Sequence, residues 1–108
     1  MKTEKILMAT TILATGALQR FRCANFAGAT AGATDAVLGV PNADYGVGEQ
    51  AGVSTHGEIL VEAGAAIAAG ARVQSDADGR VVTLAAGKAW GEARDAATAA
   101  GEIIRVLR

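Results

Sequence analysis

Glycine recurs at short intervals through the second half of the chain, and this spacing most constrains the fold. The glycines concerned are Gly57, Gly64, Gly70, Gly79, Gly87, Gly91 and Gly101. The alanine-rich segments 63–72 and 85–100 have high helix propensity, but each glycine would cost about 1 kcal/mol inside a helix. Short apolar runs between regular turn signals are typical of an all-β sandwich or barrel. We therefore predict an all-β fold, a small β-barrel or β-sandwich built from short strands and hairpins.

The predicted strands follow from the runs between these turns. They are 4–13, 18–26, 36–40, 49–55, 57–62, 71–75, 79–84, 88–94 and 102–107. In the second run, alternation places Phe21 and Cys23 on one face and Arg20 and Arg22 on the other. Residues 1–13 are apolar and β-prone, so we expect an extended N-terminal segment, either an arm or a first strand, followed by a single β domain at 14–108.

Composition excludes several classes of function. A chain of 108 residues suits one domain, and its net charge of −1 provides no basic surface for nucleic acid and no polybasic membrane patch. Aromatic residues make up only 4% of the chain, so the expected core is thin, and assembly with a partner would stabilise it.

The N-terminus has some features of a signal peptide, because lysines precede an apolar run. Glu4 within the basic region and the β-branched Thr10, Thr11 and Thr15 favour a retained strand instead. The run is too short and too polar for a membrane span. The single cysteine, Cys23, cannot form an intrachain disulfide, which fits a reducing compartment.

The stretch "QSDADGRVV" (74–82) has the most suggestive acidic pattern. If Gly79 took the glycine position of an EF-hand loop, Asp76 and Asp78 would stand at ligand positions, but Ala85 would replace the bidentate acid. Asp-Gly between two β-prone runs is a strong hairpin signal. We therefore predict that Asp76, Asp78 and Gly79 form a hairpin turn and bind no metal.

No other motif indicates catalysis. His56 has no second histidine or cysteine for zinc and no nucleophile elbow nearby. The "YGVG" stretch (45–48) lacks the lysine and third glycine of phosphate-binding loops. Trp90, the only tryptophan, is expected to anchor a core or an interface. The sequence thus predicts a binding or structural module with no cofactor, and not an enzyme.

The order of motifs in the C-terminal two-thirds resembles the capsid decoration, or cement, proteins of tailed bacteriophages. "HGEILVEAGAAIAAGARVQSDADGRVVTLAAG" (56–87) leads a strand into a Gly/Ala-rich turn with Ile67 and then into the "SDADGR" hairpin. "KAWGEARDAATAAGEIIRVLR" (88–108) ends on a final apolar strand. Family members often have "IGVA" where this chain has "AWGEA" (89–93), so the contact of Trp90 is expected to be particular to this protein.

The resemblance implies a structural protein of the virion, made in the host bacterial cytoplasm. It would bind the outer surface of the assembled capsid, bridge subunits of the major capsid protein and stabilise the head against DNA pressure. It would also bind itself, as a homotrimer by preference or as a homodimer. Candidate contact residues are Ile6, Leu7, Met8, Ile12 and Trp90. The alternative is a small secreted β-sandwich adhesin or carbohydrate-binding module.

Overall fold

The computed structural model describes residues 2–108, which form eight β-strands and no helix. The strands are β1 (Lys5–Leu13), β2 (Ala24–Asn25), β3 (Val37–Pro41), β4 (Gln50–Glu62), β5 (Arg72–Ser75), β6 (Val81–Thr83), β7 (Gly91–Ala93) and β8 (Ile103–Leu107). The all-β prediction is confirmed. The same residues include no helix with the length and apolar character needed to cross a membrane.

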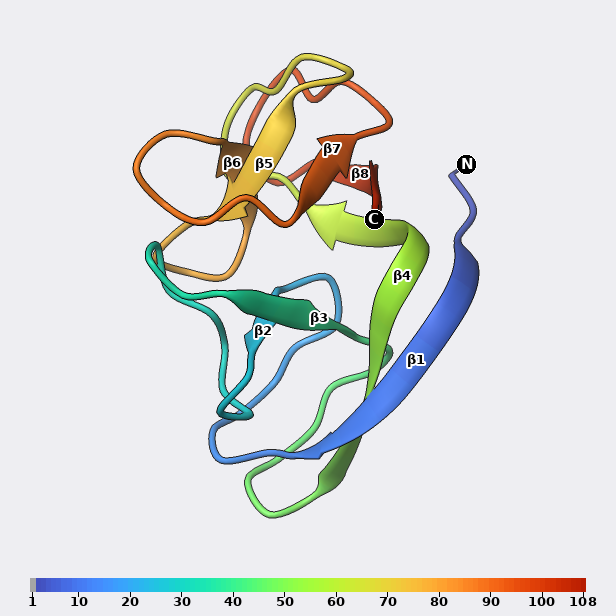
Figure 1. The fold of residues 1–108 in the computed structure, drawn as a ribbon, viewed down its shortest axis with the longest axis vertical. Coiled ribbons are helices and arrows are strands. Elements are labelled where there is room, and N and C mark those ends of the chain that lie inside the picture. The colour runs from blue at the N-terminus through green and yellow to red at the C-terminus, as the bar shows by residue number, and fades with distance from the viewer. Residues whose placement is uncertain (1) are drawn as a thin grey trace.

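The strands form one curled antiparallel sheet in the order β2-β3-β4-β8-β7-β5-β6, with β1 on the opposite edge of β4 (Figure 1). The sheet curls far enough for its parts to meet again. Ala63, just after β4, forms a parallel bridge with Val81 of β6, and the Gly64 amide donates to the Val81 carbonyl at 2.7 Å. The upper half of the molecule is therefore a nearly closed small barrel.

Strand β4 is the longest element and organises the fold. It pairs with β1 through Gln50–Glu58, with β8 through Glu58–Glu62, and with β3 at Val53 and Ser54. The predicted division into strands 49–55 and 57–62 is wrong, because β4 continues through His56 and Gly57. Gly57 has φ +125° and exchanges backbone hydrogen bonds with Arg108. It therefore bends β4 without ending it, so that one strand serves both halves of the sheet (Figure 1).

The predicted strand at 18–26 is also wrong, because only Ala24 and Asn25 form β2. Phe21 has φ +71°, a left-handed conformation that interrupts an extended strand. The Arg22 amide then donates back to the Gln19 carbonyl at 3.2 Å, which closes a turn. Cys23 follows this turn and is fully buried, which raises the pKa of its thiol well above the usual value because burial penalises the thiolate.

Two groups of buried apolar residues hold the sheet together. The larger lies within the curled upper half and includes Ile59, Val61, Val73, Ile104 and Val106. The smaller lies at the opposite end, beneath β1, and is built on Leu18, Ala51 and Val53. Burying each valine or isoleucine contributes about 1.5–3 kcal/mol. The larger group fixes β4, β8 and β7, the strands that border the candidate site.

Candidate partner-binding surface

Strand β1 exposes apolar side chains along its N-terminal half. Ile6 is 36% exposed, Leu7 76% and Met8 55%. Within residues 2–108, β1 pairs with β4 alone, so its outer edge is open. An edge strand with adjacent exposed apolar side chains is a favourable place for another chain to pair.

A compensated pair of bulges explains why these side chains are not covered. Ile6 lies opposite Gly57 and Met8 opposite His56, so Leu7 is an extra residue in β1. Thr55 is then the extra residue in β4, and its hydroxyl donates to the Met8 carbonyl at 3.2 Å. A bulge redirects side chains and twists the strand locally. The irregular register therefore carries Leu7 outward and restores the pairing of residues 9–13.

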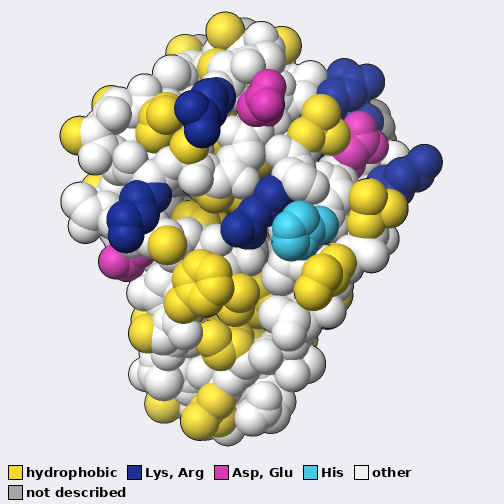
Figure 2. Space-filling model, viewed as in Figure 1, with side chains coloured by type: hydrophobic (Ala, Val, Ile, Leu, Met, Phe, Trp, Pro, Cys, Tyr) yellow, Lys and Arg dark blue, Asp and Glu magenta, His cyan; other side chains and the backbone are white. Residues whose placement is uncertain are grey.

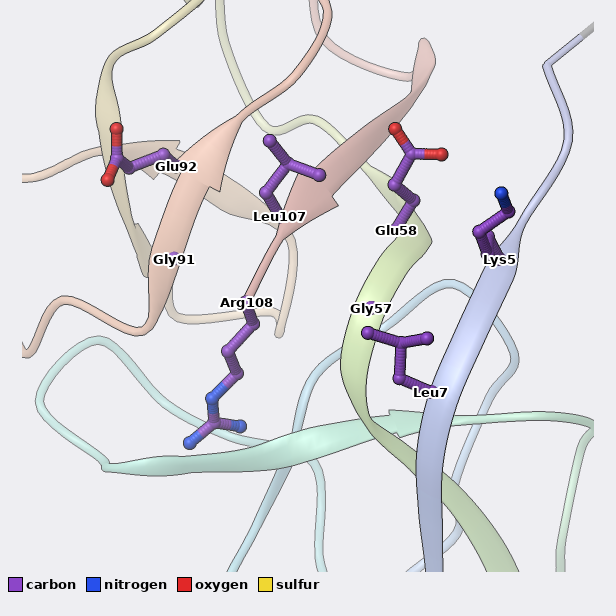
Figure 3. A pocket seen from close by; sticks show the side chains of 8 residues that line it. All are labelled: Lys5, Leu7, Gly57, Glu58, Gly91, Glu92, Leu107 and Arg108. Atoms are coloured by element: carbon purple, nitrogen blue, oxygen red, sulfur yellow. The ribbon is translucent and has the colours of Figure 1, made fainter.

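Leu7 forms one side of a groove with a volume of about 450 Å³. Leu107 of β8 forms the other side, Gly57 of β4 lies between the two leucines, and Gly91 lies beyond Leu107 on β7 (Figure 3). The remaining lining residues are charged: Lys5, Glu58, Glu92 and Arg108. The groove thus combines an apolar centre with an ionic rim.

Close backbone packing keeps the centre of the groove open. A Cβ atom on Gly57 would overlap the Lys5 carbonyl oxygen and lie 2.9 Å from the Leu7 amide nitrogen. A Cβ atom on Gly91 would lie 2.6 Å from the Leu107 carbonyl oxygen. These separations are too short for real side chains, so both positions need glycine. The hollow is therefore a direct consequence of how β1, β4, β7 and β8 approach one another.

A second hollow of about 270 Å³ adjoins the groove on the side of Trp90. Its lining residues are Arg72, Ala89, Trp90, Gly91, Glu92 and Arg108. The Arg108 guanidinium donates to the Leu38 carbonyl at 2.7 Å and lies 5.9 Å from the centre of the Trp90 ring. Partial burial lowers the pKa of Arg108 because it penalises the charged form. This cation is therefore held in place by a neutral acceptor and an aromatic ring.

The five predicted contact residues divide into two groups. Ile6, Leu7 and Met8 are exposed on β1, as described above. Trp90 is only 6% exposed and belongs to the larger core, whereas Ile12 packs against the smaller core. The large apolar area of the indole accounts for its burial. Ile12 and Trp90 therefore support the surface from inside and offer little area to a partner.

The predicted turn residues lie between β5 and β6, at the tip of a hairpin. One carboxylate oxygen of Asp76 accepts from the amides of Asp78 at 2.8 Å and Arg80 at 2.9 Å. Gly79 has φ +81°. The Arg80 guanidinium lies 3.7 Å from the carboxylates of both aspartates and 3.4 Å from that of Glu62. The acids of this turn are thus engaged by backbone amides and an internal arginine.

No metal centre is formed elsewhere in the described part of the chain, residues 2–108. No three His, Cys, Asp or Glu side chains there lie close enough to hold an ion. His56 is exposed, and its Nδ1 lies 3.1 Å from the Thr55 hydroxyl.

Two exposed features were not expected from the sequence. Leu107 completes the groove although it ends an apolar strand that looks like core. Leu13, Phe26 and Val47 form exposed apolar positions at the far end of the molecule. Leu13 ends β1, whereas Phe26 and Val47 lie on turns that are linked through Thr15 and Ala14. No periodic signal marks these residues, because their exposure depends on how distant loops meet.

Figure 2 shows one face of the molecule, with hydrophobic side chains gathered at its centre and lower part and Lys and Arg spread over its upper half.

Comparisons with known proteins place this surface in context. One solved structure with the same fold is the head fiber gp8.5 N base in bacteriophage phi29. The two chains are 19% identical, the match covers 93% of this chain and 92% of the other, and the TM-score is 0.71. A comparison with curated protein sequences gives no significant match. A family model described as phage cement protein matches residues 1–108.

The family match favours the capsid hypothesis over the secreted adhesin or carbohydrate-binding module. It agrees with a surface that has apolar and ionic contact groups and an open strand edge. The protein is a structural protein associated with the phage capsid, and the chain belongs to the phage cement protein family.

Proposed function

We propose that the protein binds the outer surface of the assembled phage capsid and bridges neighbouring subunits of the major capsid protein. In doing so it stabilises the head against the internal pressure of packaged DNA. The observation that carries this proposal is the exposed apolar segment Ile6–Leu7–Met8 on an open strand edge. Exposed apolar positions of this kind on a small protein mark interaction sites.

Edge pairing provides the physical basis of the contact. Ala14, directly after β1, donates its amide to the Glu49 carbonyl at 2.9 Å. Along an antiparallel strand, successive residues direct their backbone amide and carbonyl groups alternately towards and away from the neighbouring strand. Counting back from Ala14, the amide and carbonyl groups of Ala9, Thr11 and Leu13 therefore point away from β4. A strand from a capsid subunit could add to this edge, with backbone hydrogen bonds for affinity and side-chain contacts for specificity.

Stabilisation then follows from mass action. A protein that binds the assembled shell, and not its separated subunits, stabilises the shell by RT ln(1 + [L]/Kd) at each site. A contact that spans two subunits opposes their separation. Self-association, as a trimer by preference or as a dimer, would link several such contacts and increase the overall avidity.

The test compares two aspartate substitutions at similarly exposed positions. Leu7 is 76% exposed on β1, and Val47 is 71% exposed at the far end of the molecule. Leu7→Asp removes an apolar contact worth about 1.5–3 kcal/mol and introduces a charge into the interface, so binding should weaken by at least about tenfold. Val47→Asp should bind like the wild type.

The measurement is co-sedimentation of each purified variant with empty shells of the major capsid protein. The melting temperature of the shells is recorded in the same samples, and should rise with wild type and Val47→Asp only. Circular dichroism checks that each variant is folded. Equal binding by both variants, or loss of binding in Val47→Asp alone, would place the contact away from β1 and refute this part of the proposal.

A further inference from the structure

The two hollows described above adjoin each other. Both are lined by Gly91, Glu92 and Arg108. The apolar part lies between Leu7 and Leu107, and the second part extends from Arg108 past Trp90 to Arg72. We call the whole feature the β1–β7 groove. A partner segment lying along it would meet apolar contacts first and cationic groups next.

Positive charge in this groove is only partly balanced by the protein itself. Glu58 is already engaged by Arg94 at 3.5 Å. Among the described residues 2–108, no carboxylate lies within 4.0 Å of the charged groups of Lys5, Arg72 or Arg108. Glu92 is the one remaining acidic side chain in the lining, and it lies opposite Arg72 across the β5–β7 pairing. The two linings thus hold three cationic side chains against two acidic ones, and this excess of positive charge favours an anionic partner group.

Arg108 is prepared for such a partner. Its guanidinium is oriented by the Leu38 carbonyl and lies near the Trp90 ring, so little side-chain freedom remains to be lost on binding. Partial burial lowers its pKa because the charge is poorly solvated. A carboxylate beside it would compensate this loss of solvation with a charge-assisted hydrogen bond.

We propose that the β1–β7 groove binds an extended segment of the major capsid protein. That segment places an apolar side chain between Leu7 and Leu107 and a carboxylate beside Arg108 and Arg72. This inference rests on the proposed function and specifies the partner chemistry. A second copy of this chain is the competing occupant of the groove, and self-association of the free protein would reveal it.

The test uses charge reversal at Arg72, which is exposed and makes no ion pair among the described residues. Lys88→Glu is the matched control, because Lys88 is an exposed cation outside both linings. Binding to empty shells of the major capsid protein is measured by co-sedimentation across a range of NaCl concentrations. Arg72→Glu should weaken binding about tenfold and reduce its salt dependence. Lys88→Glu should do neither.

The outcomes separate this inference from the proposed function. If wild-type protein does not bind shells, the proposed function fails. If wild type binds and Arg72→Glu binds equally well, or if Lys88→Glu is weakened as much, the groove assignment is overturned while capsid binding stands. Analytical ultracentrifugation of the free protein, without shells, tests whether a second copy of the chain occupies the groove instead. Loss of self-association in Arg72→Glu would assign the groove to a second copy and also overturn the proposal.

Discussion

Gly57 is a position where a single methyl group should seriously damage the fold. Its φ of +125° is a conformation that other residues rarely adopt, and that conformational cost is about 1–3 kcal/mol. In Gly57→Ala the new Cβ would also overlap the Lys5 carbonyl oxygen and crowd the Leu7 amide. Relief requires β1 to move away from β4 at the point where β4 also pairs with β8. We expect a total loss of about 3–4 kcal/mol in the free energy of unfolding.

Gly48→Ala separates the two contributions. Gly48 also has a positive φ, of +89°, but nothing lies within 4 Å of a Cβ atom built there. The alanine variant should therefore show only the conformational cost, about 1 kcal/mol. The difference between the two variants measures the steric contact at the junction of β1, β4 and β8.

Urea and thermal denaturation followed by circular dichroism provide the comparison. For a domain of this size each 1 kcal/mol corresponds to about 4–8 °C in Tm, so Gly48→Ala should melt a few degrees below the wild type. Gly57→Ala should melt more than about 10 °C below it, or should fail to fold. If the two variants were equally stable, β4 would not require glycine at its bend, and the account of this junction would be refuted.

Three further predictions concern stability. Arg105 donates side-chain hydrogen bonds to Asp95 and lowers the pKa of that carboxyl from 3.8 to about 2. The ionised Asp95 therefore stabilises the fold at pH values above its unfolded-state pKa, and this stabilisation is lost as the pH falls from there towards 2. In acid thermal melts the stability of the wild type should decline over that pH range, whereas Asp95→Asn should show a flatter pH profile. Trp90→Ala should cost about 3–5 kcal/mol in chemical denaturation, and a near-neutral result would show that the indole is not part of the core. Asp76→Ala should cost about 1 kcal/mol because two amides lose their acceptor, whereas Asp78→Ala, with a side chain 66% exposed, should change Tm little.

Turn chemistry made much of the fold predictable. Gly70, Gly79 and Gly101 all have positive φ, and each precedes a strand whose expected bounds differ only slightly from the observed ones. Glycine reaches this conformation at low cost, so its position carries local information that needs no tertiary context. The same reasoning failed at Gly57, because a glycine with positive φ can bend a paired strand as well as end one.

The errors arose where tertiary contacts override the local pattern. The alternation of charged and apolar side chains from Arg20 to Cys23 suggests a strand. In the structure Phe21 adopts φ +71°, and its carbonyl accepts a hydrogen bond from the Glu62 amide at 2.8 Å. A left-handed phenylalanine has no signature in the sequence. Its conformation is set by the packing of a distant strand.

The candidate surface was predictable only in part. The apolar run Ile6–Met8 is visible in the sequence, and the structure exposes it on β1. The groove was not foreseen, because Leu7, Arg72 and Leu107 come from separate strands and meet only through the sheet order β4-β8-β7-β5. Trp90 was expected to anchor a core or an interface, and local sequence does not distinguish these two environments.

The most direct test of the central claim is a cryo-EM map of empty capsid shells mixed with the purified protein. We predict density on the outer surface of the shell, with each copy spanning two neighbouring subunits of the major capsid protein and β1 turned towards them. Shells mixed with Leu7→Asp should lack this density. Density confined to a single capsid subunit would contradict the bridging role, and bare shells with wild-type protein would contradict capsid binding itself.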